Sequence, residues 1–111
     1  MANTFNNAKT NLTATTITDV YQAPASAGAV SIVLSTLIAN TNGANSSNVN
    51  LVLTDSSNNV LSTILFLIAV PQNTTLEAVS NKIVLKAGEK LRATASVANY
   101  LSVTVSCLEI T

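Results

Sequence analysis

Histidine and tryptophan are absent from this chain of 111 residues, and cysteine occurs only once. Without histidine, and with a single thiol, the chain has almost no nitrogen or sulfur ligands for a transition metal. We therefore expect no metal and no other cofactor. Cys107 cannot form an internal disulfide, and it lies in an alternating apolar run. That pattern predicts a buried, unreactive side chain.

Charge is also scarce: five basic and five acidic residues make up 9% of the chain and leave a formal net charge of zero. Soluble proteins average roughly 25% charged residues. Five scattered cations give no electrostatic footprint for nucleic acid, so we expect no nucleic-acid partner.

Catalytic groups are few as well. Without histidine, the general base of a hydrolytic site could only be a lysine or a carboxylate. The five acids stand far apart in the sequence, and the pattern predicts exposed positions for the four lysines, Lys9, Lys82, Lys86 and Lys90. We therefore predict that the protein is not an enzyme.

Long apolar runs are missing too. The longest, residues 29–39 and 60–70, have eleven residues each, whereas a membrane-spanning helix needs about 20. We expect no membrane partner. The first seven residues lack the basic and apolar regions of a secretory signal, so we expect none here.

The chain consists instead of 48% hydrophobic residues together with 41 serine, threonine and asparagine residues. Its apolar residues fall in short runs rich in β-branched types, about ten residues apart, and no stretch has the spacing of an amphipathic helix. We predict a single-domain, all-β antiparallel sandwich of seven to nine short strands. Strand count favours a jelly roll, with an immunoglobulin-like sandwich as the alternative.

The clearest local signal is a hairpin, in which residues 49–54 and 60–70 flank five turn-forming residues. We predict that Asp55 caps this turn by accepting hydrogen bonds from nearby main-chain amides. Gly88 is predicted to supply a positive φ at a second turn. In the last strand, the apolar parity changes between Cys107 and Leu108, which predicts a bulge or an exit from the sheet.

The first nine residues are rich in asparagine and have no periodicity. We predict that residues 1–9 form an N-terminal arm, outside a β-sandwich domain at 10–111, and that the arm becomes ordered on docking to a partner. The candidate docking residues are Asn3, Phe5, Asn6 and Asn7. Tyr21 and Tyr100 are candidate exposed contact aromatics near strand ends. Phe66 lies within an apolar run and is predicted to be a core residue.

Residues 60–70 carry no charge. An exposed edge of this kind pairs readily with other chains, and zero net charge favours association. Two interpretations are open. The protein is an assembly subunit whose apolar surface other copies bury, or residues 60–70 are a core strand covered on both faces.

Several segments resemble small virion proteins of tailed bacteriophages, including those of marine cyanobacteria. They are residues 1–5 with 7–8, 15–24 (TTITDVYQAP), 53–55, 85–91 and 103–110 (VTVSCLEI). The resemblance implies a non-enzymatic β-sandwich component of the virion, assembled in the host cytoplasm. The expected role is capsid decoration by a homo-oligomer, a trimer at first expectation. Its partner is the major capsid protein or another virion protein, and it bridges capsid subunits and stabilises the head. The alternatives are a neck, collar or tail-fibre-associated subunit and, in another class, a module that binds host glycans.

Overall fold

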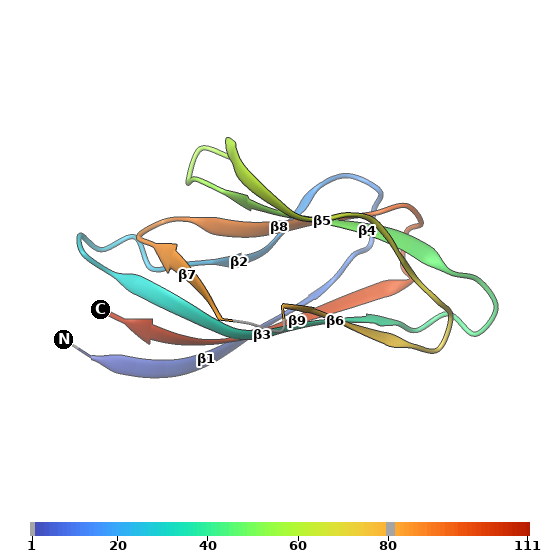
Figure 1. The fold of residues 1–111 in the computed structure, drawn as a ribbon, viewed down its shortest axis with the longest axis horizontal. Coiled ribbons are helices and arrows are strands. Elements are labelled where there is room, and N and C mark those ends of the chain that lie inside the picture. Colours follow the sequence, from blue (N-terminus) through green and yellow to red (C-terminus); the bar gives the residue numbers. More distant parts are fainter. Residues whose placement is uncertain (1, 80–81) are drawn as a thin grey trace.

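The computed structural model describes residues 2–79 and 82–111, which form nine strands in two antiparallel sheets, one above the other (Figure 1). The strands are β1 (Asn3–Asn11), β2 (Thr18–Gln22), β3 (Val30–Asn40), β4 (Ser47–Thr54), β5 (Val60–Val70), β6 (Thr75–Val79), β7 (Ile83–Lys86), β8 (Lys90–Ala95) and β9 (Leu101–Ile110). The predicted all-β sandwich is confirmed. Within these ranges no helix is both long and apolar enough to cross a bilayer.

The order of the strands is that of a jelly roll. Sheet A has the order β1–β9–β3–β6, with β7 also paired with β3, and sheet B has the order β2–β8–β4–β5. The pairs are nested along the chain: β1 with β9, β2 with β8, β3 with β6 and β7, and β4 with β5. One long antiparallel hairpin folded over on itself produces this nesting. The jelly roll is therefore the observed topology, and the immunoglobulin-like alternative is wrong.

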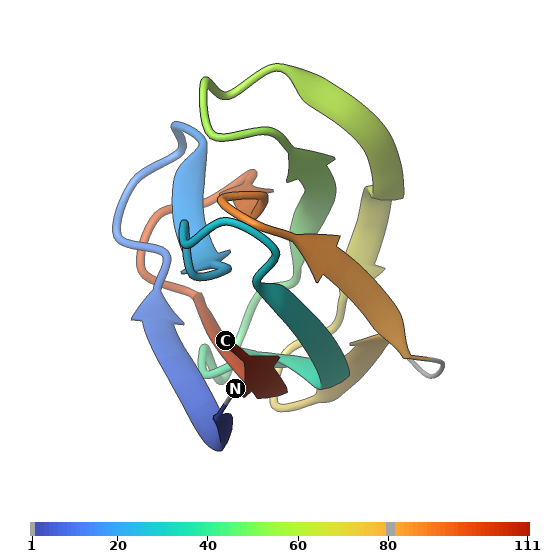
Figure 2. The ribbon, with the colours of Figure 1, turned by 90° about the vertical axis from the view of Figure 1, so that its left-hand side faces the viewer.

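The molecule is elongated, with extents of 47 × 25 × 21 Å, and both termini lie at one end (Figure 2). Two hydrogen bonds, both 3.0 Å long, join the amide and carbonyl groups of Ala2 to those of Thr111. The paired termini therefore mark one end of sheet A.

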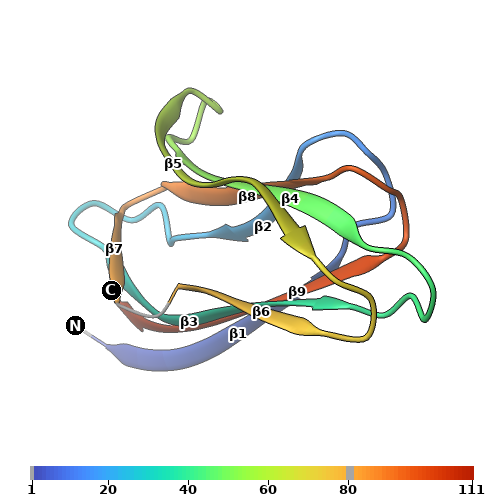
Figure 3. The ribbon, with the colours of Figure 1, turned by 45° about the vertical axis from the view of Figure 1, so that its right-hand side comes forward.

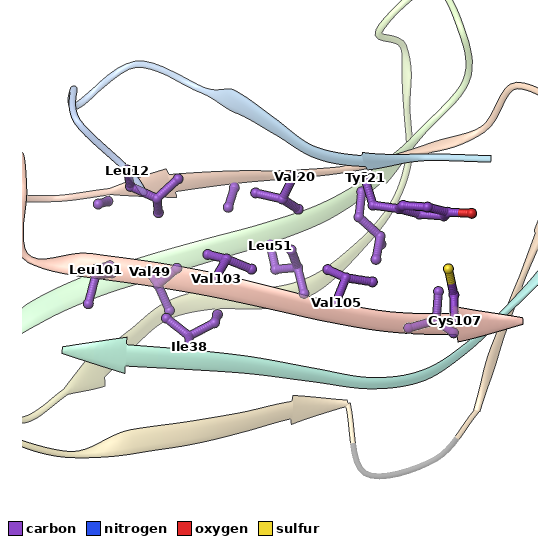
Figure 4. Close-up of a cluster of buried hydrophobic side chains, with 14 of the residues drawn as sticks. Leu12, Val20, Tyr21, Ile38, Val49, Leu51, Leu101, Val103, Val105 and Cys107 are labelled. Carbon is purple, nitrogen blue, oxygen red and sulfur yellow. The ribbon is translucent and has the colours of Figure 1, made fainter. Parts of the chain in front are cut away.

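The core lies between the two sheets (Figure 4). On β9 the predicted alternation is confirmed, because Leu101, Val103, Val105 and Cys107 are each at most 1% exposed. Buried residues of β4 and β8, among them Leu51, face them from sheet B. Burying a large aliphatic side chain contributes about 1.5–3 kcal/mol, so these inner rows supply most of the stability.

Both turn predictions are confirmed. Asp55 Oδ1 accepts hydrogen bonds from the amides of Ser57 and Asn59, each at 2.9 Å, and Asn59 Nδ2 donates to Asp55 Oδ2 at 3.0 Å. Hydrogen bonds from Asn59 lower the pKa of Asp55 below its ordinary value. Gly88 has a φ of +77°, a conformation that favours glycine.

The N-terminal segment is an edge strand, so its prediction as an arm is wrong. β1 pairs with β9 from Asn3 opposite Ile110 to Asn11 opposite Ser102, and the predicted domain boundary between residues 9 and 10 falls inside it. Most of its side chains are exposed, and therefore they show no apolar alternation. Main-chain hydrogen bonds hold the strand in place, and these leave no mark on a side-chain pattern.

The bulge predicted near the end of the chain is absent from the pairing of β9 with β1, which keeps its register to Ile110. In the β3–β9 pair the irregularity lies in β3, between Val33 and Ser35. The parity change has another cause: Leu108 and Ile110 are apolar residues on the outer face of sheet A, while Cys107 points into the core.

Candidate assembly surfaces

A row of four apolar side chains crosses the outer face of sheet A near the termini. Phe5 of β1 stands opposite Leu108 of β9, and Leu108 stands opposite Ile32 of β3. Ile32 in turn stands opposite Val84 of β7. Directly opposed residues share a face of the sheet. This row faces solvent, since Phe5 is 77% exposed and Val84 is 58% exposed.

Three more apolar residues extend the row. Ile110 and Val30 stand opposite each other, each two residues from the Leu108–Ile32 pair in its own strand. Leu34 is exposed at the bulge of β3. We call the whole set the apolar patch: Phe5, Val30, Ile32, Leu34, Val84, Leu108 and Ile110. Lys86, opposite Val30, borders it.

A hollow of about 240 Å³ opens at the patch and is lined by Phe5, Asn6, Asn7, Leu34, Ser106 and Cys107. Pockets that bind small molecules usually measure about 300–1,000 Å³. This hollow is smaller, so its size suits one side chain of a protein partner better than a cofactor or metabolite.

The patch covers only the half of the outer face that lies near the termini. Farther along the strands, Lys9 stands opposite Thr104, which stands opposite Leu37, which stands opposite Glu77. That row begins and ends with a charge, and its apolar member, Leu37, is 40% exposed. Polar residues adjoin the row, namely Ser102 and Ser106 on β9 and Thr75 on β6. The outer face of sheet A is therefore divided into an apolar half and a polar half.

β1 brings three of the four predicted docking residues to the patch or to its hollow. Phe5 lies in the apolar row, and Asn7 lines the hollow. Asn3, opposite Ile110, lies at the margin. Asn6 also lines the hollow but belongs to the inner set, opposite Cys107, and its Nδ2 donates to Glu109 Oε2 at 3.5 Å.

Three members of the row, Ile32, Val84 and Leu108, were not predicted as contact residues. The sequence did contain one signal, in the alternation of the last strand. Leu108 and Ile110 are apolar but fall on the positions that alternate with the core residues, so they face outward. The strand pairing that aligns them with Phe5 cannot be read from the sequence.

Tyr21 is a core residue, so its prediction as an exposed aromatic is wrong: it is 5% exposed (Figure 4). Its hydroxyl donates to Glu109 Oε2 at 2.6 Å and lies 2.8 Å from Ser31 Oγ. Burial, with hydrogen bonds to Cys107 and Glu109, raises the pKa of Tyr21 far above its ordinary value. The phenol stays protonated. It joins β2 to β9 by donating to Glu109 and joins β2 to β3 by accepting from the Ser31 hydroxyl.

Tyr100 is half-buried against the core, and its hydroxyl accepts a hydrogen bond from Asn45 Nδ2 at 3.3 Å. It directly precedes β9, whereas Tyr21 contacts Glu109 near the other end of that strand. The two rings thus lie at opposite ends of the sandwich and form no common platform on which a sugar could stack.

An ion cluster lies on the outer face of sheet B. Asp19 of β2 forms a salt bridge with Lys90, with 3.2 Å between Asp19 Oδ2 and Lys90 Nζ. Its Oδ1 accepts a hydrogen bond from Arg92 Nε. Burial alone would raise the pKa of Asp19, but the hydrogen bonds and charges of Arg92 and Lys90 outweigh it and hold that pKa below 3.8. The cluster ties the edge strand β2 to β8.

Lys90 is buried, so its predicted exposed position is wrong. The β4–β5 turn lies over it, and its Nζ donates to Asn58 Oδ1 at 2.9 Å. The local alternation placed Lys90 on the outer face correctly, but it could not show that a turn distant in the sequence covers that position.

β5 is an edge of sheet B: it pairs with β4, and no second strand among the described residues pairs with it. We call its exposed large apolar residues the β5 edge: Val60, Leu61, Phe66, Leu67 and Ile68. Phe66 is 67% exposed, so its predicted core position is wrong. The interpretation of residues 60–70 as a core strand covered on both faces is excluded.

A bulge pushes two adjacent side chains of the β5 edge outward. The register with β4 moves from Val49 opposite Ile68 to Leu51 opposite Leu65, so Phe66 and Leu67 share one partner position. Leu67 has a φ of +51°, which is uncommon for a residue other than glycine. Its amide donates to Asn50 Oδ1 at 2.6 Å. Figure 3 shows the start of β5 curling away from the rest of sheet B.

Among residues 2–79 and 82–111, no group of three or more histidine, cysteine, aspartate or glutamate residues is placed to hold a metal ion. We therefore assign no residue to a metal or cofactor. The surface features that stand out are the apolar patch and the β5 edge.

No protein-family model matches the chain, and no curated protein matches it at a significant level. Among solved structures, one of Bacillus endospore appendages, described as a family of disulfide-linked pili, is similar in fold. The TM-score is 0.59 at 11% identity, over 99% of this chain and 87% of that one. A second structure, of an infectious bursal disease virus strain, has a TM-score of 0.37 at 8% identity, over 98% of this chain and 30% of that one. A score that low supports no argument, and the first likeness shows the fold alone.

Proposed function

We propose that this chain is a non-enzymatic structural subunit of a tailed-phage virion that decorates the outside of the head. The observation that carries the proposal is the apolar patch, a contiguous apolar surface left exposed on a rigid sheet. Contiguous exposed apolar surfaces mark sites of protein–protein contact. The resemblance of several segments to small virion proteins directs the proposal to a phage particle.

The fold supports a role in assembly in a second way. The pilus structure with the similar jelly roll is an assembled polymer by its description, so the same architecture serves there as a building block. In the present chain the patch contains no charged residue. A neutral contact of this kind neither steers nor repels a partner at long range, and it is insensitive to salt.

In this mechanism the rigid sandwich lies across neighbouring major capsid subunits, with the apolar patch against the shell. Phe5 is the anchor, because it is the most exposed residue of the patch, at 77%, and large aromatic side chains dominate interface energetics. The free energy of binding opposes separation of the capsid subunits after the genome is packaged. No bond is made or broken.

The experiment is co-sedimentation of the purified chain with heads of the parent phage that lack it. We expect the wild-type chain to bind and Phe5→Ser to bind at least about tenfold more weakly, as expected for an interface anchor. Asn11→Ser, an exposed residue of the same strand that lies opposite Ser102 in the polar half of the outer face, is the matched control and should bind as the wild type does. Equal binding by Phe5→Ser and the wild type would refute the assigned surface. Binding only to collars or tails would replace decoration by the neck or tail alternative.

Deleting residues 2–9 is not a clean test, since β1 covers one edge of β9 over its whole length. Such a deletion exposes a new sheet edge and removes Ala8 from its contact with the core. A loss of binding could then come from the damaged sheet or from the missing Phe5. The single substitution of Phe5 tests the side chain alone, because Phe5 is exposed and the strand stays in place.

A further inference from the structure

We propose that the β5 edge is a two-fold contact between two copies of this chain. This contact deepens the proposed assembly function and rests on it, because it specifies how subunits join one another. It is separate from the apolar patch, which lies on the other sheet.

The β5 edge exposes enough apolar surface for a weak dimer. The exposed fractions of its five large apolar residues lie between 38% and 67%. They amount to roughly 500 Å² per copy, if a fully open large apolar side chain contributes roughly 180 Å². Ile68 stands opposite the buried Val49, and Val60 and Leu61 lie at the other end of β5, so one contact covers only part of this area. Two copies would therefore bury at most roughly 1,000 Å², the lower bound for a specific interface. We therefore expect a dissociation constant in the micromolar range.

The absence of charge favours a second copy as the occupant. In a two-fold contact, residues near the axis face their own copies, so any charge there meets a like charge. β5 and residues 56–59 before it contain no charged residue, and the surface can face itself without repulsion. The other edge strands each carry a charge that discourages pairing: Lys9 in β1, Asp19 in β2, Glu77 in β6 and Lys86 in β7.

The bulges decide how the two copies touch. The β4–β5 register shifts at three places, and a bulged edge is poorly suited to a long hydrogen-bonded ladder with another strand. The contact is therefore made by side chains, with Phe66 and Leu67 at its centre. The backbone holds Leu67 in a disfavoured left-handed conformation while both side chains stand in solvent. Strain that persists at such a site points to function.

The test is sedimentation velocity of the full chain from about 2 to about 200 µM, the range in which a micromolar dimer assembles. The wild type should move from 11.5 kDa towards twice that mass. The double variant Phe66→Ser, Leu67→Asn should stay at 11.5 kDa throughout, because asparagine tolerates the left-handed backbone but removes the apolar contact. Phe5→Ser removes a phenylalanine from the other sheet that is more exposed than Phe66, 77% against 67%, and should dimerise as the wild type does.

Amide hydrogen exchange of the wild type, measured at the two ends of this concentration range, is a second test that needs no variant. Slower exchange at high concentration should be confined to β5 and its surroundings. A wild type that stays monomeric, a trimer, unchanged dimerisation of the double variant, or protection on sheet A would each overturn the inference. The proposed function fails separately, by unchanged particle binding of Phe5→Ser.

Discussion

The outer faces of the two sheets differ in chemistry, although both sheets use long antiparallel strands and bury their inner faces against the same core. Sheet A presents the apolar patch near the termini. Sheet B presents mostly polar and charged residues there, including the cluster of Asp19, Lys90 and Arg92. Its apolar exposure is concentrated at its β5 edge. The outer face of sheet A is therefore suited to a contact from which water is excluded, and the outer face of sheet B is suited to exposure to solvent.

This difference separates the groups that stabilise the fold from the groups that are available to a partner. On sheet B the charged groups pair within the chain, because Asp19 forms ion pairs with both Lys90 and Arg92 and holds an edge strand in place. On sheet A the exposed Phe5 and Val84 extend from the sheet into solvent. Substitutions on the two faces should therefore affect different measurements.

The largest expected effect comes from placing a charge in the apolar patch. Val84→Asp should weaken particle binding by about 100-fold or more, because docking would bury an unpaired carboxylate. Thermal stability should change little, since Val84 is more than half exposed. The matched control is Thr94→Asp on the outer face of sheet B, measured by the same co-sedimentation. If Thr94→Asp weakens binding as much as Val84→Asp does, the loss is not specific to the apolar patch and the assignment of that patch as the docking surface fails.

A smaller effect is expected from breaking the ion cluster. Asp19→Asn should destabilise the fold by about 1 kcal/mol at pH 7, because solvent screens the half-exposed carboxylate, and should leave particle binding unchanged. The folded-state pKa of Asp19 is lowered, so its contribution is present above the unfolded pKa and is lost as pH falls through the folded value. Urea titrations at pH 7 and below pH 3 should show the difference from wild type shrinking in acid. A constant difference would contradict the ionic role.

A still smaller effect, of opposite sign, is expected at the bulge of β5. Leu67→Asn should raise the stability of the monomer by about 0.5 kcal/mol, since asparagine adopts positive φ more easily than leucine. That corresponds to about 2–3 °C in Tm, measured by differential scanning calorimetry at a concentration too low for dimers. A clear fall in Tm would show that Leu67 stabilises the monomer, and its strain would then serve folding.

The smallest expected effect is that of salt on particle binding. Raising sodium chloride from about 0.1 M to about 1 M shortens the Debye length from about 10 Å to about 3 Å. Because the apolar patch has no charged residue, the dissociation constant should change by less than about threefold, measured by co-sedimentation. A loss of affinity by ten times or more would indicate an interface that depends on ion pairs.

The strand pattern allowed the fold to be predicted well where side chains alternate. Leu101 to Cys107 alternate strictly, and the structure buries them as expected. The Asp55 turn was predictable because its hydrogen bonds are local. The nested pairing that defines the jelly roll was predicted only through the number of strands.

Two segments were misjudged because their patterns fit two structures equally well. An uncharged apolar run such as residues 60–70 is typical both of a doubly covered strand and of an apolar edge, and only the strand order distinguishes them. Residues 1–9 have the composition of a loose arm, but main-chain pairing with β9 makes them a strand.

The candidate surface was predictable only in part. Phe5 was identified because a large apolar residue stands out in a polar segment. Ile32, Leu108 and Val84 join it through the register of four strands that are distant in the sequence, which no local pattern records. Tyr21 was misplaced because its hydroxyl partners, Ser31 and Glu109, are supplied by β3 and β9.

The sharpest test is a cryo-electron microscopy reconstruction of the parent phage particle at side-chain resolution. We expect jelly-roll density on the outside of the head, with the outer face of sheet A against the shell and Phe5 enclosed by capsid residues. A particle without this chain, or one in which the apolar patch faces solvent, would show that the chain does not decorate the head through this patch.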